Sequence, residues 1–219
     1  MQEKIIANVF EKKLIAIVRG MEPEYAVGLA KALYAGGINM IECTFNQRAD
    51  DHFAATTKAI ESMNEAMGDQ ILVGAGTVLT KEQVDLAKAA GAGYIITPST
   101  DAEVIRYAKQ NDLVAIPGAL TPTEAVTAWQ AGADFVKIFP AGNVGPGYIK
   151  AMRAPLSQIP FLAVGGINEK NIPDFLKVGV TGFGVGGNLV NLEWIKAGKF
   201  DEITALAKAF VAAAQSTVA

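Results

Sequence analysis

The sequence predicts a (β/α)₈ barrel that spans residues 1–219 as one domain, with an extra N-terminal helix. Short apolar runs recur along the chain, and each is followed by small or polar residues and then by a segment with helical spacing. Most of these runs are continuously apolar, which is typical of parallel strands covered on both faces. Eight runs at even spacing favour a closed barrel over an open doubly wound sheet, because no GxGxxG motif follows the first run.

The elements follow one another in a regular order. Residues 2–12 are predicted to form a helix that packs beneath the barrel. The predicted strands are 14–19, 40–44, 71–75, 94–97, 114–117, 135–140, 161–164 and 182–185. Segments such as PEYAVGLAKALYAGG and TKEQVDLAKAAGAG lie between them, with an apolar residue every three or four positions and glycine at the expected helix end.

Composition and charge exclude several classes of protein. Hydrophobic residues make up 51% of the chain and charged residues 19%, which is typical of a globular fold. A net charge of −3 gives no general attraction to nucleic acid or to an anionic membrane. The N-terminal sequence MQEKIIANVFEKK lacks the apolar stretch of a signal peptide, and no run approaches the roughly 20 apolar residues of a membrane helix. We therefore expect a cytoplasmic protein without nucleic-acid or membrane partners.

The chain has one cysteine, Cys43, and one histidine, His52. An internal disulfide is thus impossible, and metal sites built on thiolate or imidazole ligands are not expected. Because side chains alternate along a strand, Cys43 is predicted to face the outer helices. His52 is assigned a surface or helix N-terminal role.

A lysine in an apolar strand is the first candidate for chemistry, because the active site of a closed barrel lies at the C-terminal ends of its strands. Lys137 lies in DFVKIFPAG. Burial of its amine would lower its pKa, and a neutral amine can attack a carbonyl to form a Schiff base. The alternative is a structural lysine whose ammonium group reaches solvent or pairs with a carboxylate.

Two further strands place charged residues at the same opening. Glu42, in MIECTF, is either a general acid/base or the partner of Lys137 in an ion pair. Arg19 ends LIAIVRG and could bind a carboxylate or phosphate, or form a salt bridge with Glu42. The sequences AVGGIN and FGVGGN follow the last two strands, where backbone amides of barrels often bind phosphate.

Together these motifs resemble the 2-keto-3-deoxy-6-phosphogluconate / 4-hydroxy-2-oxoglutarate (KDPG/KHG) aldolase family. The resemblance extends over nearly the whole chain and rests on IAIVRG (15–20), IECTFN (41–46), VGAGTVLT (73–80), ITPST (96–100), IPGALTPTEA (116–125), KIFPA (137–141) and AVGGI (163–167). It implies a small barrel, usually a homotrimer, that needs no metal or other cofactor. The implied reaction cleaves a 2-keto-3-deoxy-6-phospho sugar acid, or 4-hydroxy-2-oxoglutarate, to pyruvate and an aldehyde such as glyceraldehyde 3-phosphate.

The resemblance also implies roles for particular residues. Lys137 matches the Schiff-base lysine, and Glu42 matches the glutamate that transfers protons. Thr77 matches a threonine that helps to hold the keto-acid carboxylate, and Arg19 matches the active-site arginine of the first strand. The positions that match the pocket lining are Pro98, Pro117 and Phe139, and those that match the phosphate loops are Gly165, Gly166 and Gly186.

Two positions in the expected substrate site depart from the gluconate-type pattern. Asn46 stands where those members have arginine, and at this place the chain resembles the 2-keto-3-deoxy-6-phosphogalactonate branch, with which it also shares KIFP…GPxYIKA (137–151). Gly187 stands where many relatives carry a serine that binds phosphate. Phosphate would then be held by amides alone, and a smaller or unphosphorylated keto acid becomes more plausible.

Two other functions are compatible with the same residues. One is a phosphate-binding isomerase or epimerase that uses Lys137 and Glu42 as acid and base without a covalent intermediate. The other is a barrel that binds sugar phosphates without catalysis, since a fold alone never assigns a function.

Overall fold

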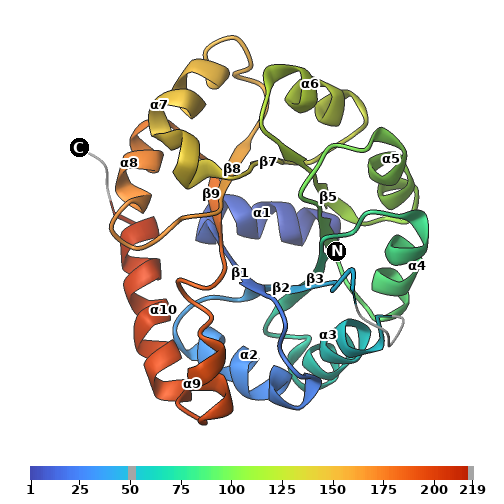
Figure 1. Cartoon of the computed structure of the whole chain (residues 1–219), viewed down its shortest axis with the longest axis vertical. Coiled ribbons are helices and arrows are strands. Elements are labelled where there is room, and N and C mark those ends of the chain that lie inside the picture. Colours follow the sequence, from blue (N-terminus) through green and yellow to red (C-terminus); the bar gives the residue numbers. More distant parts are fainter. Residues whose placement is uncertain (49–52, 217–219) are drawn as a thin grey trace.

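Parallel strands curve into a nearly closed barrel surrounded by helices (Figure 1). The structure is a computed structural model and describes residues 1–48 and 53–216, so His52 lies outside the described residues. Within them the strands are β1 (Leu14–Val18), β2 (Met40–Thr44), β3 (Leu72–Gly76), β4 (Tyr94–Ile96), β5 (Val114–Ile116), β6 (Gly118–Ala119), β7 (Val136–Ile138), β8 (Phe161–Val164) and β9 (Gly182–Val185). Their order in the sheet is β5-β4-β3-β2-β1-β9-β8-β7-β6.

The barrel closes through its fifth strand, which a proline divides in two. β5 pairs with β4, and β6 pairs with β7. Only Pro117 separates β5 from β6, and since proline has no N–H group it cannot donate to the ladder. Its carbonyl still accepts the Lys137 N–H at 2.8 Å, so the connection continues across the break. The structure thus extends the fifth predicted strand to Ala119 and confirms the predicted barrel.

Apart from α1 (Gln2–Lys12), the helices form an outer ring around the strands (Figure 1). The helices of the ring are α2 (Ala26–Ala35), α3 (Ala54–Met67), α4 (Lys81–Ala89), α5 (Ala102–Gln110), α6 (Pro122–Gln130), α7 (Ala141–Arg153), α8 (Ile172–Lys177), α9 (Leu192–Lys196) and α10 (Phe200–Ala214), with a 3₁₀ turn at Pro23–Tyr25. Among the described residues, none of these helices is both long enough and apolar enough to span a membrane.

Helix α1 is the exception to the outer ring, because it lies across one end of the barrel (Figure 1). Its buried residues Ile5 and Val9 join the cluster of side chains inside the barrel. They occupy successive turns of one helix face, which is the spacing that a helix needs to seal a surface. The predicted N-terminal helix beneath the barrel is confirmed.

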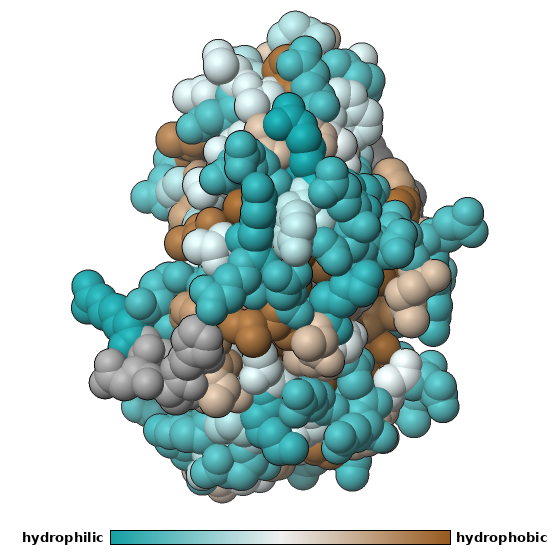
Figure 2. All heavy atoms as spheres, turned by 90° about the vertical axis from the view of Figure 1, so that its right-hand side faces the viewer, coloured by the Kyte–Doolittle hydropathy of each residue, from teal (hydrophilic) through white to brown (hydrophobic). Residues whose placement is uncertain are grey.

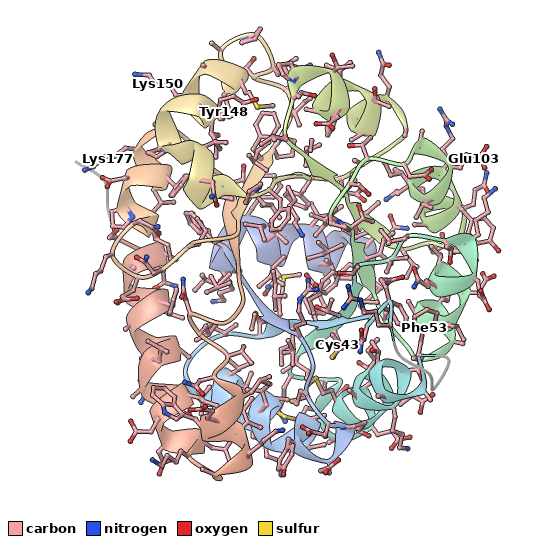
Figure 3. The ribbon with its side chains drawn as sticks, viewed as in Figure 1. Cys43, Phe53, Glu103, Tyr148, Lys150 and Lys177 are labelled. Carbon is pink, nitrogen blue, oxygen red and sulfur yellow. The ribbon has the colours of Figure 1, made fainter. Side chains whose placement is uncertain are left out.

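Two layers of apolar side chains stabilise this arrangement. The inner cluster fills the barrel and includes Met40, Leu72 and Tyr94, whereas the larger outer cluster lies between strands and helices. Alternation along each strand divides side chains between the two layers. Cys43 belongs to the outer cluster and faces the helices, as predicted (Figure 3). Its Sγ lies 4.0 Å from the Sδ of Met63 on α3.

The solvent-facing sides of the helices carry most of the polar residues. Figure 2 shows a largely hydrophilic face with scattered hydrophobic residues, on the side where α4 and α5 lie.

Candidate active site

A cavity of about 330 Å³ opens where the carboxyl ends of several strands converge. Its walls come from β1, β2, β7, β8 and β9, from the segments that follow them, and from the segment after β4. Most of the residues that the sequence assigned to the site line it: Arg19, Glu42, Pro98, Lys137, Phe139, Gly165, Gly166, Gly186 and Gly187. The cavity thus brings together side chains that are more than 100 positions apart in the chain, such as Arg19 and Lys137.

Lys137 is the central residue of β7, and its side chain points into this cavity. Its neighbours Val136 and Ile138 pack in the outer layer, so strand alternation directs the lysine inward. Only 7% of the residue is exposed. Burial lowers the pKa of the Lys137 amine, and the positive charge of Arg19 lowers it further, whereas the nearby Glu42 raises it. Burial is the largest of these effects, which favours the neutral, nucleophilic amine.

Phe139 lies beside the lysine nitrogen. The Nζ of Lys137 is 4.9 Å from the centre of the Phe139 ring, within the range of a cation–π contact. The ring face is electron-rich and interacts favourably with positive charge. This contact would stabilise an iminium cation formed on Lys137 without adding a counterion.

Glu42 projects into the same cavity from β2 and is 2% exposed. Its Oε1 accepts a hydrogen bond from the Thr44 hydroxyl at 3.0 Å. Gly76 on β3 makes room for the carboxyl group, because a Cβ at that position would lie 1.6 Å from Oε1. Burial raises the pKa of Glu42, and the charge of Lys137, the Thr44 hydrogen bond and the charge of Arg19 oppose the increase. A glutamate in this environment holds its proton to a higher pH than an exposed glutamate does, which suits a group that both donates and accepts protons.

The ion pairs of the described residues include neither Lys137, Glu42 nor Arg19. The structural alternatives from the sequence were a Lys137 that reaches solvent or pairs with a carboxylate such as Glu42, and an Arg19–Glu42 salt bridge; Lys137 is only 7% exposed. Arg19 instead lies exposed at the rim of the cavity. Its guanidinium is therefore available to bind an anionic substrate.

The glycines of the two last loops form the opposite wall of the cavity. Gly165 and Gly166 have φ values of +89° and +73°, a region that favours glycine. The Gly165 carbonyl accepts the N–H of Gly142 at 2.8 Å, and the Asn188 side chain donates to the Ile167 carbonyl at 2.8 Å. The first bond joins the β8 loop to the start of α7, and the second joins it to the β9 loop. The glycines thus present a backbone surface on which an anion can bind.

Three of the predicted residues do not line the cavity, and the geometry explains each case. Pro117 follows the inward-facing Ile116 on the fifth strand, so alternation turns it away from the interior. Asn46 lies beyond the end of β2 and borders a neighbouring cavity of about 250 Å³ against α3. Thr77 is half-buried with φ +54°, an unusual conformation for a β-branched residue, and its backbone turns away after β3.

The sequence did not identify Asn188 as a residue of the site. It lines the cavity next to Gly186 and Gly187 and donates from its amide to the adjoining loop. It directly follows the second GG pair, so the position alone could have indicated it. Four apolar or small residues of the lining were also missed: Ile17, Val164, Ile167 and Gly184.

A network of two side-chain amides holds the loop that carries Thr77. Gln83, 1% exposed, accepts the Leu79 N–H at 2.6 Å through Oε1 and donates through Nε2 to Oε1 of Gln47 at 3.0 Å. The Nε2 of Gln47 then donates to the Thr77 carbonyl at 2.9 Å. A side chain of α4, Gln83, and one of the loop after β2, Gln47, thus hold Thr77 in its unusual backbone conformation.

Replacing Gln83 with leucine should therefore destabilise the protein. The substitution removes the acceptor of the Leu79 N–H and the donor to Oε1 of Gln47, and the free energy of unfolding should fall by about 1–3 kcal/mol. Urea unfolding followed by circular dichroism measures this. The control is Gln130→Leu at the exposed end of α6, where a change of less than about 0.5 kcal/mol is expected. Equal stabilities of the two variants would show that the network is not important.

Comparison with known proteins agrees with this geometry. The chain matches the model of the family described as "Aldolase: KDPG and KHG aldolase" over residues 5–206. The 2-dehydro-3-deoxy-6-phosphogalactonate aldolase of Escherichia coli (strain K12) is 40% identical over 207 residues, which cover 94% of this chain and 96% of that protein.

Two solved structures extend the comparison. A KDPG aldolase from Legionella pneumophila, with pyruvate captured at low pH as a covalent carbinolamine intermediate, is 32% identical with a TM-score of 0.84, covering 94% of this chain and 97% of that one. A cube-shaped, porous protein cage designed by fusing symmetric oligomeric domains is 38% identical with a TM-score of 0.82, covering 92% of this chain and 71% of that one.

Proposed function

The chain belongs to the KDPG and KHG aldolase family and is a class I aldolase, and from this premise we propose which of its residues perform the reaction. Lys137 forms the Schiff base with a 2-keto acid, and Glu42 transfers the protons. The relative in which pyruvate is captured as a carbinolamine supports a covalent mechanism. The comparisons do not support an isomerase without a covalent intermediate or a barrel that only binds sugar phosphates.

The proposed cycle follows from an amine and a carboxyl group that share a cavity. The neutral amine of Lys137 adds to the C2 carbonyl. Glu42 in its acid form then protonates the carbinolamine hydroxyl, which leaves as water and gives an iminium. Glu42, directly or through a water molecule, removes the proton of the C4 hydroxyl. The C3–C4 bond then breaks, its electron pair moves into the iminium to form an enamine, and the aldehyde leaves. Protonation at C3 and hydrolysis release pyruvate and regenerate the amine.

The observation that carries this proposal is the environment of the Lys137 nitrogen. It is buried in an apolar strand, opens into the cavity with Glu42, and takes part in no ion pair of the described residues. A structural lysine would be expected to pair with the buried carboxylate or to extend to solvent.

Borohydride trapping tests the assignment of the nucleophile. With pyruvate and borohydride, the reduced adduct should form on Lys137, identified by peptide mass spectrometry. Lys150, exposed on α7, is the internal control and should stay unmodified. Folded protein that yields no adduct, or an adduct on another lysine, would refute the assignment.

We propose that the substrate is of the galactonate type, on the strength of Asn46 and of the relative from Escherichia coli. The side chain of Asn46 is exposed and its Oδ1 accepts the backbone N–H of Arg48 at 3.1 Å. The proposal includes a phosphate held by amides of the Gly165–Gly166 and Gly186–Gly187 loops, with Arg19 at the rim.

Substituting Asn46→Arg should change the preference between the two epimeric sugar acid phosphates. Asn46 borders the neighbouring cavity, but arginine is longer, and a guanidinium that reaches the substrate from this loop would add a charge-assisted hydrogen bond to the gluconate type. The ratio of kcat/KM should then shift toward that type by about tenfold. Cleavage of both phosphates and of 4-hydroxy-2-oxoglutarate, with lactate dehydrogenase as the readout for pyruvate, measures the ratio. The wild type should favour the galactonate type, and an unchanged ratio in the variant would exclude position 46 as a determinant.

We further propose a cytoplasmic homotrimer. The designed cage built from symmetric oligomeric domains supports an oligomer. Large apolar side chains that remain exposed on the single chain also support it, among them Phe10, Tyr34, Leu79 and Leu120. Native mass spectrometry determines the subunit number, and a monomer at micromolar concentration would contradict the proposal.

A further inference from the structure

One oxygen of the Glu42 carboxyl group and one buried phenolic oxygen lack hydrogen-bond partners among the described residues. They are Oε2 of Glu42 and the phenolic oxygen of Tyr94, a residue that is fully buried. Buried polar atoms are nearly always paired, because an unpaired one costs free energy. Phenylalanine would fill the same volume as Tyr94 without this cost, so the hydroxyl needs an explanation.

The strand register brings these side chains to one level of the barrel. Glu42 on β2 pairs in register with Gly74 on β3, and Gly74 pairs with Tyr94 on β4. A Cβ on Gly74 would lie 2.3 Å from Cε2 and 2.5 Å from Cζ of Tyr94. The phenol ring therefore crosses β3 in the space that Gly74 leaves, toward β2. The Glu42 carboxyl group occupies the corresponding space above Gly76.

We propose that Tyr94 is a positioning residue whose hydroxyl pairs with Oε2 of Glu42 during the reaction. A hydroxyl group can accept a hydrogen bond from a protonated carboxyl group and donate one to a carboxylate. It can therefore serve both states between which a proton-transferring glutamate alternates. Thr44 holds the other oxygen, Oε1, in the same manner. The inference rests on the proposed role of Glu42.

The pairing has a definite consequence for the titration of Glu42. The groups that face this carboxyl are Lys137 from β7, Arg19 from the end of β1, Thr44 on its own strand and Tyr94 from β4. Burial raises the pKa of Glu42, and a hydroxyl that donates to the ionised form opposes this increase. Without the Tyr94 hydroxyl, the pKa of Glu42 should rise further.

Exchange of the pyruvate methyl protons with deuterium isolates the step that uses Glu42. In D₂O, the carboxylate removes a C3 proton from the iminium on Lys137, the enamine forms, and a deuteron returns to C3. NMR follows the exchange rate against pH. In Tyr94→Phe, the acidic limb of this profile should move upward by about one pH unit, so the rate below the limb falls about tenfold.

Two further variants calibrate the result. Thr44→Val removes the bond to Oε1 and should shift the limb in the same direction. Tyr107→Phe removes a surface phenol that donates to Asp85 at 2.9 Å, and should leave the profile unchanged. Thermal unfolding establishes that each variant is folded over the pH range.

The outcomes separate this inference from the proposed function. A folded wild type that neither traps pyruvate on Lys137 nor exchanges its methyl protons would overturn the function itself. Suppose that the wild type traps pyruvate and exchanges its methyl protons. The pairing is then refuted if the acidic limb of the exchange profile is unchanged in Tyr94→Phe but shifts in Thr44→Val. Movement of the limb in Tyr94→Phe with normal trapping supports the pairing, because a purely structural ring would not affect the titration.

Discussion

Lys137→Met is expected to abolish aldol cleavage and to make the protein more stable. Methionine fills a similar volume in β7 but offers no nucleophile, so kcat/KM should fall by more than about 10⁴-fold, as for the loss of the nucleophile in other covalent enzymes. The amine is buried without an ion-pair partner among the described residues, and its removal relieves a desolvation cost. The free energy of unfolding should therefore rise by about 1–3 kcal/mol.

The opposite signs of these two effects make the experiment informative. The coupled lactate dehydrogenase assay measures cleavage, and urea unfolding measures stability. Lys150→Met, on the exposed face of α7, is the matched control and should change neither quantity appreciably. Loss of both activity and stability would instead identify Lys137 as a structural residue.

Glu42→Gln should keep the capture of pyruvate but slow turnover. The amide has nearly the same shape as the carboxyl group, so the cavity and the access to Lys137 should persist. It cannot accept and return a proton, and kcat should fall by about 10²–10⁴-fold, the usual range for a general acid/base. An unchanged kcat would refute the role of Glu42 in proton transfer.

The pH dependence of kcat is a second test of the role of Glu42. Burial raises the pKa of Glu42, so the ionised form is present only above the range of exposed glutamates. The wild-type kcat should therefore increase with pH through this raised pKa. In Glu42→Gln this increase of kcat with pH should be absent. The control is Glu103→Gln on α5, which removes a surface ion pair with Lys81 and should preserve both the rate and its profile.

Much of the fold was predictable because local patterns control it. Continuous apolar runs mark strands that are buried on both faces, and the spacing of Ile5 and Val9 marks the helix that closes the barrel. The extent of the fifth strand was not predictable, since a proline normally ends a strand. Pairing of β5 with β4 and of β6 with β7 shows that both neighbours accept the interruption.

The candidate site was predictable to the degree that strand geometry alone places its residues. Lys137 and Glu42 face the cavity because alternation inside a strand is periodic. Beyond the strand ends this rule fails, and Asn46 and Thr77 lie elsewhere because loop conformation depends on contacts such as the Gln47 bond to the Thr77 carbonyl.

By itself, the sequence determined the barrel, the family resemblance and the identity of the buried amine and carboxyl group. Only the tertiary structure decided that Gly76 leaves the space for Glu42, that no ion pair of the described residues includes Lys137, and that Tyr94 crosses β3 toward the same carboxyl group. The physical reason is that local pattern specifies which face of a strand a side chain occupies. Distances across a barrel depend on the register of separate strands, which forms only when the whole sheet closes.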